Sequence, residues 1–270
     1  MTGLEDVICG LAQSSAAKRE PGDYEKDGLL YCGRCRTPKQ CIADFGTPVI
    51  VGCTCLCEQE KIRAELAEQK RMERMMEIRA LRTQGIQDHA IRRYRFDTAE
   101  PSKNIVRCQR YVDRWEEMRR HNNGLLFWGG VGTGKTFAAA CIANALIGQG
   151  YPALVTSLPK ILNAGWDKSD LVRQMKHFQL LVLDDLGVER ESDYSLEIVQ
   201  FVVDERYKAR LPLIVTTNLT LTELENPSNV RYARIYDRVL EMCVPVHFDG
   251  PSRRKAKAQD KMRFAREAFG

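Results

Sequence analysis

The chain has 270 residues, of which 44% are hydrophobic and 29% charged, and its formal net charge is +5. This balance excludes a mainly disordered chain, and no apolar run approaches the roughly 20 residues that a membrane-spanning helix needs. Residues 1–20 carry Glu5 and Asp6 where a secretion signal needs positive charge, so we expect a cytoplasmic protein without a membrane partner. The mild positive charge permits contact with nucleic acid without demonstrating it.

Cysteines cluster near the start of the chain, where six of the ten lie between residues 32 and 57. A C-x-x-C pair opens the cluster, and a C-x-C-x-C run closes it after residues 49–51, which we expect to form a strand. In a reducing compartment such clusters are typical of metal ligands, and two knuckles joined by a hairpin suit tetrahedral Zn²⁺. We predict a zinc module over residues 1–57, with an iron–sulfur cluster as a minor alternative. The first choice of ligands is Cys32, Cys35, Cys53 and Cys55, with Cys41 and Cys57 as alternates.

Residues 58–86 predict a charged linker helix. Residues 58–83 contain neither Gly nor Pro, and a narrow apolar stripe recurs at helical spacing through Ile62, Leu66, Met72 and Met76. Gly85 is expected to cap the end of this helix. The cysteines outside the cluster are expected to be small buried residues, namely Cys9, Cys108, Cys141 and Cys243.

From residue 87 onward, short apolar runs alternate with longer helical stretches. The expected strands are residues 124–128, 153–156, 180–183, 213–216 and 244–248, with helices over 136–147 and 230–240. Strands separated by helices of this kind pair in parallel through right-handed crossovers. Pro245 indicates that the last strand lies at an edge. We therefore predict an α/β domain over residues 87–270, built on a five-stranded parallel sheet.

Residues 129–136 read Gly-Gly-Val-Gly-Thr-Gly-Lys-Thr, which matches the phosphate-binding pattern G-x-x-x-x-G-K-[ST] (Walker A) completely. The glycines let backbone N–H groups converge on a phosphate, and the following helix points its positive end at the same oxygens. Lys135 is expected to reach the β and γ phosphates of ATP, and the Thr136 hydroxyl to bind Mg²⁺. The other predicted contacts to ATP or ADP come from Gly130, Val131, Gly132, Thr133 and Gly134.

Two further strands end in polar residues. Asp184 and Asp185 follow the strand at 180–183, and carboxylates beside a core are rare without a partner. We expect Asp184 to hold Mg²⁺ through water and Asp185 to orient or deprotonate the attacking water, although many ATPases have Glu at this second position. Asn218 follows Thr216 and Thr217 at the end of the next strand, where it is expected to contact the γ-phosphate or the attacking water. One strand fits between the phosphate-loop strand and the Asp184 strand, which predicts the sheet order 5-1-4-3-2.

Three arginines lie along the expected helix at 230–240, namely Arg231, Arg234 and Arg238. Arg234 and Arg238 are four residues apart and share a helix face. Surface charge is the plain interpretation. The predicted strand order is that of P-loop ATPases of the additional-strand type. In such a fold, one of these arginines is a candidate arginine finger that reaches the γ-phosphate bound by a neighbouring subunit.

Taken together, these motifs resemble the DnaC/DnaI-type AAA+ helicase loaders and the related IstB transposition helpers. The resemblance covers about residues 94–270 and adds three elements to the phosphate loop and to Thr216-Thr-Asn218: Leu181-Val-Leu-Asp-Asp-Leu-Gly187, Arg234-Ile-Tyr-Asp-Arg238 and Gly250-Pro-Ser-Arg-Arg-Lys255. It implies that Asn218 is sensor 1, Arg238 the arginine finger and Arg254 the sensor-2 arginine. Arg253 stands where an aromatic residue is more usual, which leaves the choice between Arg253 and Arg254 open.

The resemblance also implies a function. Loaders of this family bind a replicative hexameric helicase (DnaB-like) and place it on single-stranded DNA, with ATP controlling the exchange, and those of the DnaI and phage types carry an N-terminal zinc module that docks on the helicase. An IstB-like ATP-dependent helper of a transposase is the alternative. Asp185 also leaves open a nucleotide-dependent DNA-binding module that hardly hydrolyses ATP. The expected activity is therefore ATP hydrolysis that is weak or regulated by DNA or a partner, with self-association through the AAA+ domain.

Overall fold

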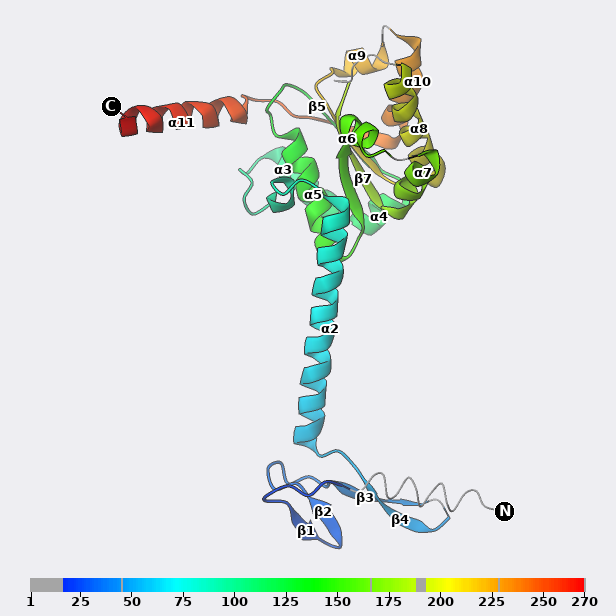
Figure 1. The fold of residues 1–270 in the computed structure, drawn as a ribbon, viewed down its shortest axis with the longest axis vertical. Helices are drawn as coiled ribbons and strands as arrows, with labels where there is room; N and C mark the ends of the chain where they lie inside the picture. Colours follow the sequence, from blue (N-terminus) through cyan, green and yellow to red (C-terminus); the bar gives the residue numbers. More distant parts are fainter. Residues whose placement is uncertain (1–16, 45, 166, 188–192, 228, 270) are drawn as a thin grey trace. The chain divides into compact units, whose positions relative to one another are not determined.

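The computed structural model describes residues 17–44, 46–165, 167–187, 193–227 and 229–269 (Figure 1). It separates into two units, Met1–Met75 and Met76–Gly270, and each is described by itself. Glu5, Asp6 and Cys9 lie outside the described residues, so the expectations that depend on them stay predictions. Within the described ranges, no helix is long and apolar enough to cross a membrane.

The first unit contains two β-hairpins. Strands β1 (Tyr24–Lys26) and β2 (Leu29–Tyr31) pair antiparallel, as do β3 (Gln40–Asp44) and β4 (Pro48–Gly52), which includes the strand expected at 49–51. Asp27 and Gly28 join the first pair and both have positive φ values, 52° and 76°, as a tight two-residue hairpin turn requires. Among the described residues of strands and loops here, the buried apolar ones are Leu30, Cys32 and Cys55.

Helix α2 (Leu56–Gly85) follows the second hairpin and begins two residues before the predicted linker helix. The apolar stripe of Ile62, Leu66, Met72 and Met76 is exposed along it, because charged residues surround a stripe too narrow to anchor the helix. Gly85 is not in the left-handed conformation of a C-cap. It is required for another reason: a Cβ atom there would lie 1.9 Å from the Ala153 carbonyl oxygen.

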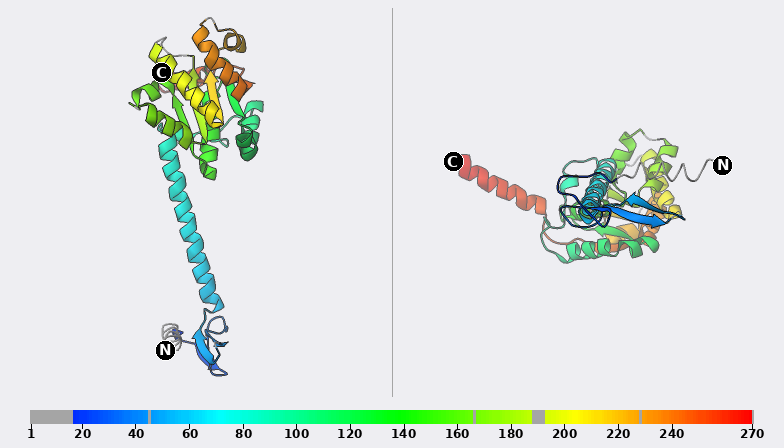
Figure 2. Two further views of the ribbon diagram at one scale, coloured as in Figure 1. Left: turned by 90° about the vertical axis from the view of Figure 1, so that its right-hand side faces the viewer. Right: turned by 90° about the horizontal axis from the view of Figure 1, so that it is seen from below.

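The second unit is built on a five-stranded parallel sheet with helices on both faces (Figure 2). Its strands are β5 (Gly124–Trp128), β6 (Ala153–Ser157), β7 (Leu180–Leu186), β8 (Leu213–Thr217) and β9 (Cys243–His247). Their order is β6-β7-β8-β5-β9, which confirms the predicted order 5-1-4-3-2. Pro245 lies on the edge strand β9, as predicted.

Each face of the sheet has its own apolar core, because neighbouring strand residues point to opposite sides and both faces are covered. Leu126, for example, belongs to one core and Phe127 to the other. The first core includes residues of α6 (Leu158–Asn163), α7 (Lys168–His177), α8 (Asp193–Ala209), α9 (Leu221–Glu225) and α10 (Val230–Met242). The second includes residues of α3 (Lys103–Asp113), α4 (Trp115–Arg120) and α5 (Lys135–Gln149), with the short helix η1 (Ile91–Arg93) beside it.

The second core also holds the end of the linker, since Ile86 is 1% exposed and pairs with Val155 through an isolated bridge. Cys108 and Cys141 are buried in this unit too, as is Cys243, which confirms the expectation for these three residues. Burial raises the pKa of both Cys108 and Cys141 to about 12, and it raises the pKa of Cys243 as well. Helix α11 (Arg253–Phe269) is largely exposed over its described side chains.

One buried arginine, Arg206, holds the segments from which strands β7 and β8 start. Arg206 of α8 is 0% exposed, and its guanidinium donates hydrogen bonds to the carbonyl oxygens of Met175, Phe178, Gln179 and Pro212. These carbonyls lie around the starts of β7 and β8. Desolvation lowers the pKa of Arg206 to about 9, which leaves the side chain charged at neutral pH.

Candidate functional site

The phosphate loop connects β5 to α5, and its conformation depends on glycine. Gly129, Gly132 and Gly134 have φ values of 134°, 81° and 103°, a region that other residues rarely adopt. A Cβ atom on Gly132 would lie 2.2 Å from the Ser252 hydroxyl oxygen. Since Gly134 at the N-cap of α5 has no side chain, it leaves the first N–H groups of the helix to an anion.

Lys135 opens α5 and is 5% exposed. Its ammonium donates hydrogen bonds to the carbonyl oxygens of Gly129 and Gly130, both at 2.7 Å, and to Asn218 Oδ1 at 2.8 Å. Burial lowers the pKa of Lys135, while Asp185 and Asp184 oppose that shift. The predicted sensor residue Asn218 therefore lies beside the phosphate loop, and the Lys135 ammonium joins it to two carbonyl oxygens of that loop.

The other predicted loop residues lie as follows. Thr133 is buried and donates a hydrogen bond from its hydroxyl to the Gly130 carbonyl oxygen at 2.9 Å, which tightens the turn. Val131 is 63% exposed. The side chain of Val131 thus contributes nothing to the interior of the loop, and any contact from it to a nucleotide would come from its backbone.

The acidic end of β7 lies against the start of α5. Thr136 Oγ1 donates a hydrogen bond to Asp184 Oδ1 at 2.8 Å, and Thr216 Oγ1 of β8 donates to the same oxygen at 2.7 Å. Burial raises the pKa of Asp184, and these two hydrogen bonds counteract the rise. A hydroxyl and a carboxylate in contact offer the hard oxygen ligands that Mg²⁺ prefers.

Asp185 is exposed, and its φ of 57° is unusual for a residue other than glycine. Its backbone N–H donates to Thr216 Oγ1 at 2.9 Å, where the pairing of β7 with β8 shifts register between Leu183 and Leu186. The sequence places Thr216 within the Thr216-Thr-Asn218 element, but the expected contact is assigned there to Asn218. The signal for Thr216 itself is a polar residue that directly follows the apolar residues 213–215.

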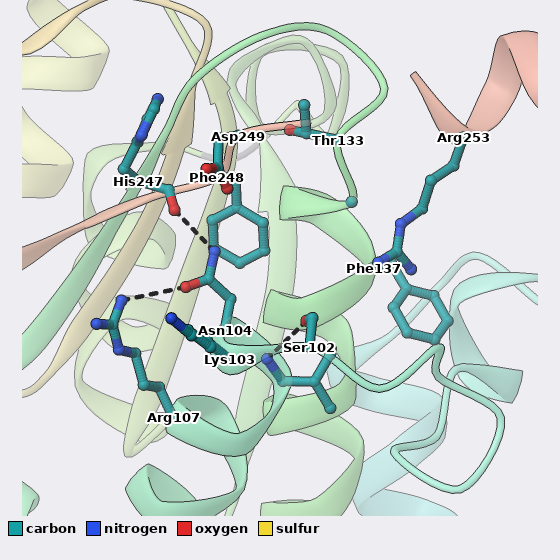
Figure 3. Close-up of a pocket in the computed structure, with 12 residues that line it drawn as sticks. Ser102, Lys103, Asn104, Arg107, Thr133, Phe137, His247, Phe248, Asp249 and Arg253 are labelled. Carbon is teal, nitrogen blue, oxygen red and sulfur yellow. Dashed lines mark hydrogen bonds between the residues drawn. The ribbon is translucent and has the colours of Figure 1, made fainter. Parts of the chain in front are cut away.

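A cavity of about 380 Å³ lies next to the phosphate loop (Figure 3). Its walls come from the start of α3, from the phosphate loop and α5, from residues 247–249 at the end of β9, and from Arg253. Asn104 joins two of these walls, since its side-chain amide donates to the His247 carbonyl oxygen at 2.7 Å. A cavity in this position can hold the part of a nucleotide that extends beyond its phosphates.

The two candidate sensor-2 arginines differ in position. In Figure 3, Arg253 reaches from the segment after β9 toward Phe137, and its Nε atom would lie 3.7 Å from a Cβ atom built on Gly134. The backbone N–H of Arg253 also donates a hydrogen bond to the Gly132 carbonyl oxygen at 3.0 Å. Arg254, which the resemblance favoured, is exposed. The structure thus places Arg253 at the phosphate loop.

The three arginines of α10 differ in their ion-pair partners and in their exposure. Arg238 forms an ion pair with Asp204 of α8, and its guanidinium lies 5.7 Å from the centre of the Tyr207 ring. Both partners of that pair are partly buried, with side-chain exposures of 32% and 21%. Arg231 pairs with Asp193, and Arg234 is exposed. The predicted finger is therefore held within its own chain.

Four cysteines of the first unit come together. The Sγ atoms of Cys32, Cys35, Cys55 and Cys57 all lie within 4.8 Å of one another. This set differs from the first choice made from the sequence, because it contains Cys57 in place of Cys53. Helix α2 begins at Leu56 and turns Cys57 toward the other thiols, whereas the Cys53 thiol lies 3.5 Å from the Pro38 carbonyl oxygen.

The four thiols strongly influence one another. The Thr37 hydroxyl lies 3.0 Å from Cys35 Sγ and lowers the pKa of Cys35 to about 5. The neighbouring thiols, Cys55 first, raise the pKa of Cys57 to about 12. Four thiolates this close repel one another, so they ionise together only around a cation. Cys41, the other alternate, is exposed on β3.

Several curated proteins are similar in sequence, and three of them show the range. The replicative helicase loader DnaC of Escherichia coli K12 is 28% identical over 67% of this chain and 76% of its own length. The replicative helicase loader DnaI of Bacillus subtilis is 27% identical over 58% of this chain and 56% of its own length. The phage-like element PBSX protein XkdC of Bacillus subtilis is 27% identical over 89% of this chain and 90% of its own length.

Solved structures share the fold. A crystal structure of DnaI has a TM-score of 0.52 at 24% identity, covering 62% of this chain and 93% of that one. A crystal structure of the DnaC helicase loader has a TM-score of 0.52 at 21% identity, covering 60% of this chain and all of that one. The sheet and its helices therefore have the same fold as these two structures. The model of the IstB-like ATP binding protein family matches residues 53–261, and the chain belongs to this family.

Proposed function

We propose that this chain is an ATP-dependent loader that binds a replicative hexameric helicase and delivers it to single-stranded DNA in replication initiation. The observation that carries the proposal is that a chain homologous to two curated helicase loaders brings Lys135, Thr136, Asp184 and Asn218 together at one end of its sheet. A cytoplasmic location belongs to the same proposal.

In this proposal the site binds ATP or ADP with its phosphates on the loop 129–136. Lys135 exchanges its bonds to the loop carbonyls for bonds to the β and γ phosphates. Thr136 and Asp184 would hold Mg²⁺, which when bound supplies positive charge against the phosphate oxygens. Asp185 orients the attacking water, and Asn218 contacts the γ-phosphate or that water from β8. Arg253 contacts the nucleotide from the segment after β9.

We assign Arg238 as the finger that acts on the nucleotide of a neighbouring subunit. Such a contact is head-to-tail, and repeated copies of it form a ring or an open spiral. Within its own chain Arg238 already pairs with Asp204 and lies near Tyr207. Assembly must therefore exchange the Asp204 carboxylate for a phosphate of the neighbour, which links hydrolysis to self-association.

For the first unit we propose a structural zinc site and a docking role on the helicase. Cys32, Cys35, Cys55 and Cys57 would hold Zn²⁺ through four thiolates, the donor set of many structural zinc sites. Zinc supplies there the positive charge that lets four neighbouring thiols ionise together. The docking role comes from the resemblance to loaders with an N-terminal zinc module.

A loading assay tests the proposal. The full chain is mixed with the hexameric replicative helicase of its source organism and with circular single-stranded DNA, with ATP or ADP, and helicase bound to DNA is measured. We expect coelution of chain and helicase, and ATP-dependent loading that Lys135→Ala abolishes. Absence of both coelution and loading would contradict the proposal.

The resemblance leaves one alternative, an IstB-like helper of a transposase, and the matching family model carries the IstB name. The same coelution experiment with a transposase in place of the helicase separates the two functions. Steady-state ATP hydrolysis with and without single-stranded DNA separates either from a DNA-binding module that hardly hydrolyses ATP. Turnover that stays at background under both conditions would support that third function.

A further inference from the structure

We infer that Thr216 is a positioning residue that orients the Asp184 carboxylate for Mg²⁺ and holds the backbone of Asp185. The inference rests on the proposed ATP site and deepens it. Thr216 lies on β8, is 0% exposed and contacts both acidic residues of β7 through a single hydroxyl group. Neither the loop motif nor the acidic pair identifies it.

The direction of each hydrogen bond follows from the number of hydrogens. A threonine hydroxyl carries one hydrogen and two lone pairs. The Asp185 N–H points at Thr216 Oγ1 at 2.9 Å, so the hydroxyl must accept there. Its single hydrogen therefore goes to Asp184 Oδ1, 2.7 Å away. Because Thr216 is fully buried, bulk water does not compete for either bond.

Thr216 also differs in task from Thr136, the second donor to Asp184. Thr136 lies at the start of α5 and is itself a proposed Mg²⁺ ligand, so its oxygen is shared between the metal and the carboxylate. Thr216 reaches the same Oδ1 from the neighbouring strand and restricts rotation of the carboxylate. A hydrogen bond of this kind behind a metal ligand typically changes metal affinity by roughly 10- to 100-fold.

The backbone contact has its own consequence. Asp185 has a φ of 57° and sits in the register shift between Leu183 and Leu186. A residue other than glycine keeps such a conformation only where its surroundings hold it. The Thr216 hydroxyl accepts a hydrogen bond from the Asp185 N–H at this point. The Thr216 side chain therefore holds the Asp184 carboxylate directly and the Asp185 carboxylate through its backbone.

The chain offers a matched control in the next residue. Thr217 is also 0% exposed, but its hydroxyl donates to the Leu186 carbonyl oxygen at 2.7 Å and accepts from the Leu219 N–H at 3.1 Å. Thr216→Val and Thr217→Val therefore remove the same atom from equally buried positions on one strand. Thr216→Val loses a hydrogen bond to the Asp184 carboxylate, whereas Thr217→Val loses one to a backbone carbonyl oxygen.

The test measures binding of a fluorescent ATP analogue to the full chain, first in excess EDTA and then across a Mg²⁺ titration. We expect Thr216→Val to leave metal-free binding unchanged and to raise the Mg²⁺ concentration at half-saturation by roughly tenfold or more. Thr217→Val should leave that concentration at its wild-type value, and Thr216→Ser, which keeps the hydroxyl, should restore it. If Thr216→Val is insoluble, Thr216→Ala against Thr216→Ser makes the same comparison.

Equal shifts in Thr216→Val and Thr217→Val would overturn the inference, as would failure of Thr216→Ser to restore the Mg²⁺ requirement. These outcomes differ from failure of the proposed function. In that case the wild-type chain itself would not bind the ATP analogue at any Mg²⁺ concentration.

Discussion

Replacing Cys57 by Ser tests which four thiols form the zinc site of the first unit. The structure brings Cys57 together with Cys32, Cys35 and Cys55, whereas the sequence favoured Cys53. Cys57→Ser should release the metal, and Cys53→Ser should retain it. The two variants make the same chemical change four residues apart, so each is the control for the other.

The expected effect is large because little else stabilises this unit. Leu30 is the one buried residue other than cysteine among the described apolar residues of the unit. Burying such a side chain contributes about 1.5–3 kcal/mol. A structural zinc site contributes an apparent binding free energy of about 10–16 kcal/mol at neutral pH. Loss of one thiolate should therefore unfold the hairpins, while the second unit keeps its own two cores.

The assay combines metal analysis with hydrogen exchange on the full chain, purified without chelator. Wild type and Cys53→Ser should carry one zinc per chain and show protected amides in β3 and β4. Cys57→Ser should carry none and lose that protection, with exchange in β5 and β7 unchanged. Zinc retained by Cys57→Ser and lost from Cys53→Ser would refute the geometric assignment, and an iron chromophore would refute the choice of metal.

Three further predictions concern the second unit. Lys135→Ala should weaken ATP binding roughly 10- to 100-fold, since a hydrogen bond to a charged group contributes about 1.5–3 kcal/mol; unchanged affinity in a fluorescent-nucleotide titration would contradict its role. Arg238→Ala should bind nucleotide but lose hydrolysis, because a finger contributes a factor of about 10³–10⁵, and mixing it with Lys135→Ala should restore some turnover. Mixtures that stay inactive at every protein concentration would argue against action between subunits. A fragment that starts at Met76 should melt at a higher temperature than one that starts at Gln87, because only the longer fragment keeps Ile86, which is buried. Equal melting temperatures would show that Ile86 adds no stability.

The sequence predicted the sheet well because its signals are local and strong. Each strand is a short apolar run, and the phosphate loop and the Asp184–Asp185 pair mark which strands end at the site. The order of the strands followed from these marks, and the structure confirms it.

What could not be predicted depends on how separate elements pack. The pair Arg238–Asp204 joins two helices, and neither residue alone indicates the other. Thr216 becomes distinctive only when β8 lies beside β7. Similarly, Cys57 joins the thiol cluster because α2 begins at Leu56, earlier than the charged pattern indicated.

The burial of Cys108, Cys141 and Cys243 makes this chain convenient for site-selective labelling. Alkylating reagents attack thiolates, and these three thiols are both enclosed and hard to ionise. Among the described cysteines, those outside the proposed zinc set and the buried trio are Cys41, which is exposed, and Cys53, which is half-buried. Among the described cysteines, a maleimide dye would therefore attach first at Cys41, on strand β3, where a fluorophore would report on the first unit.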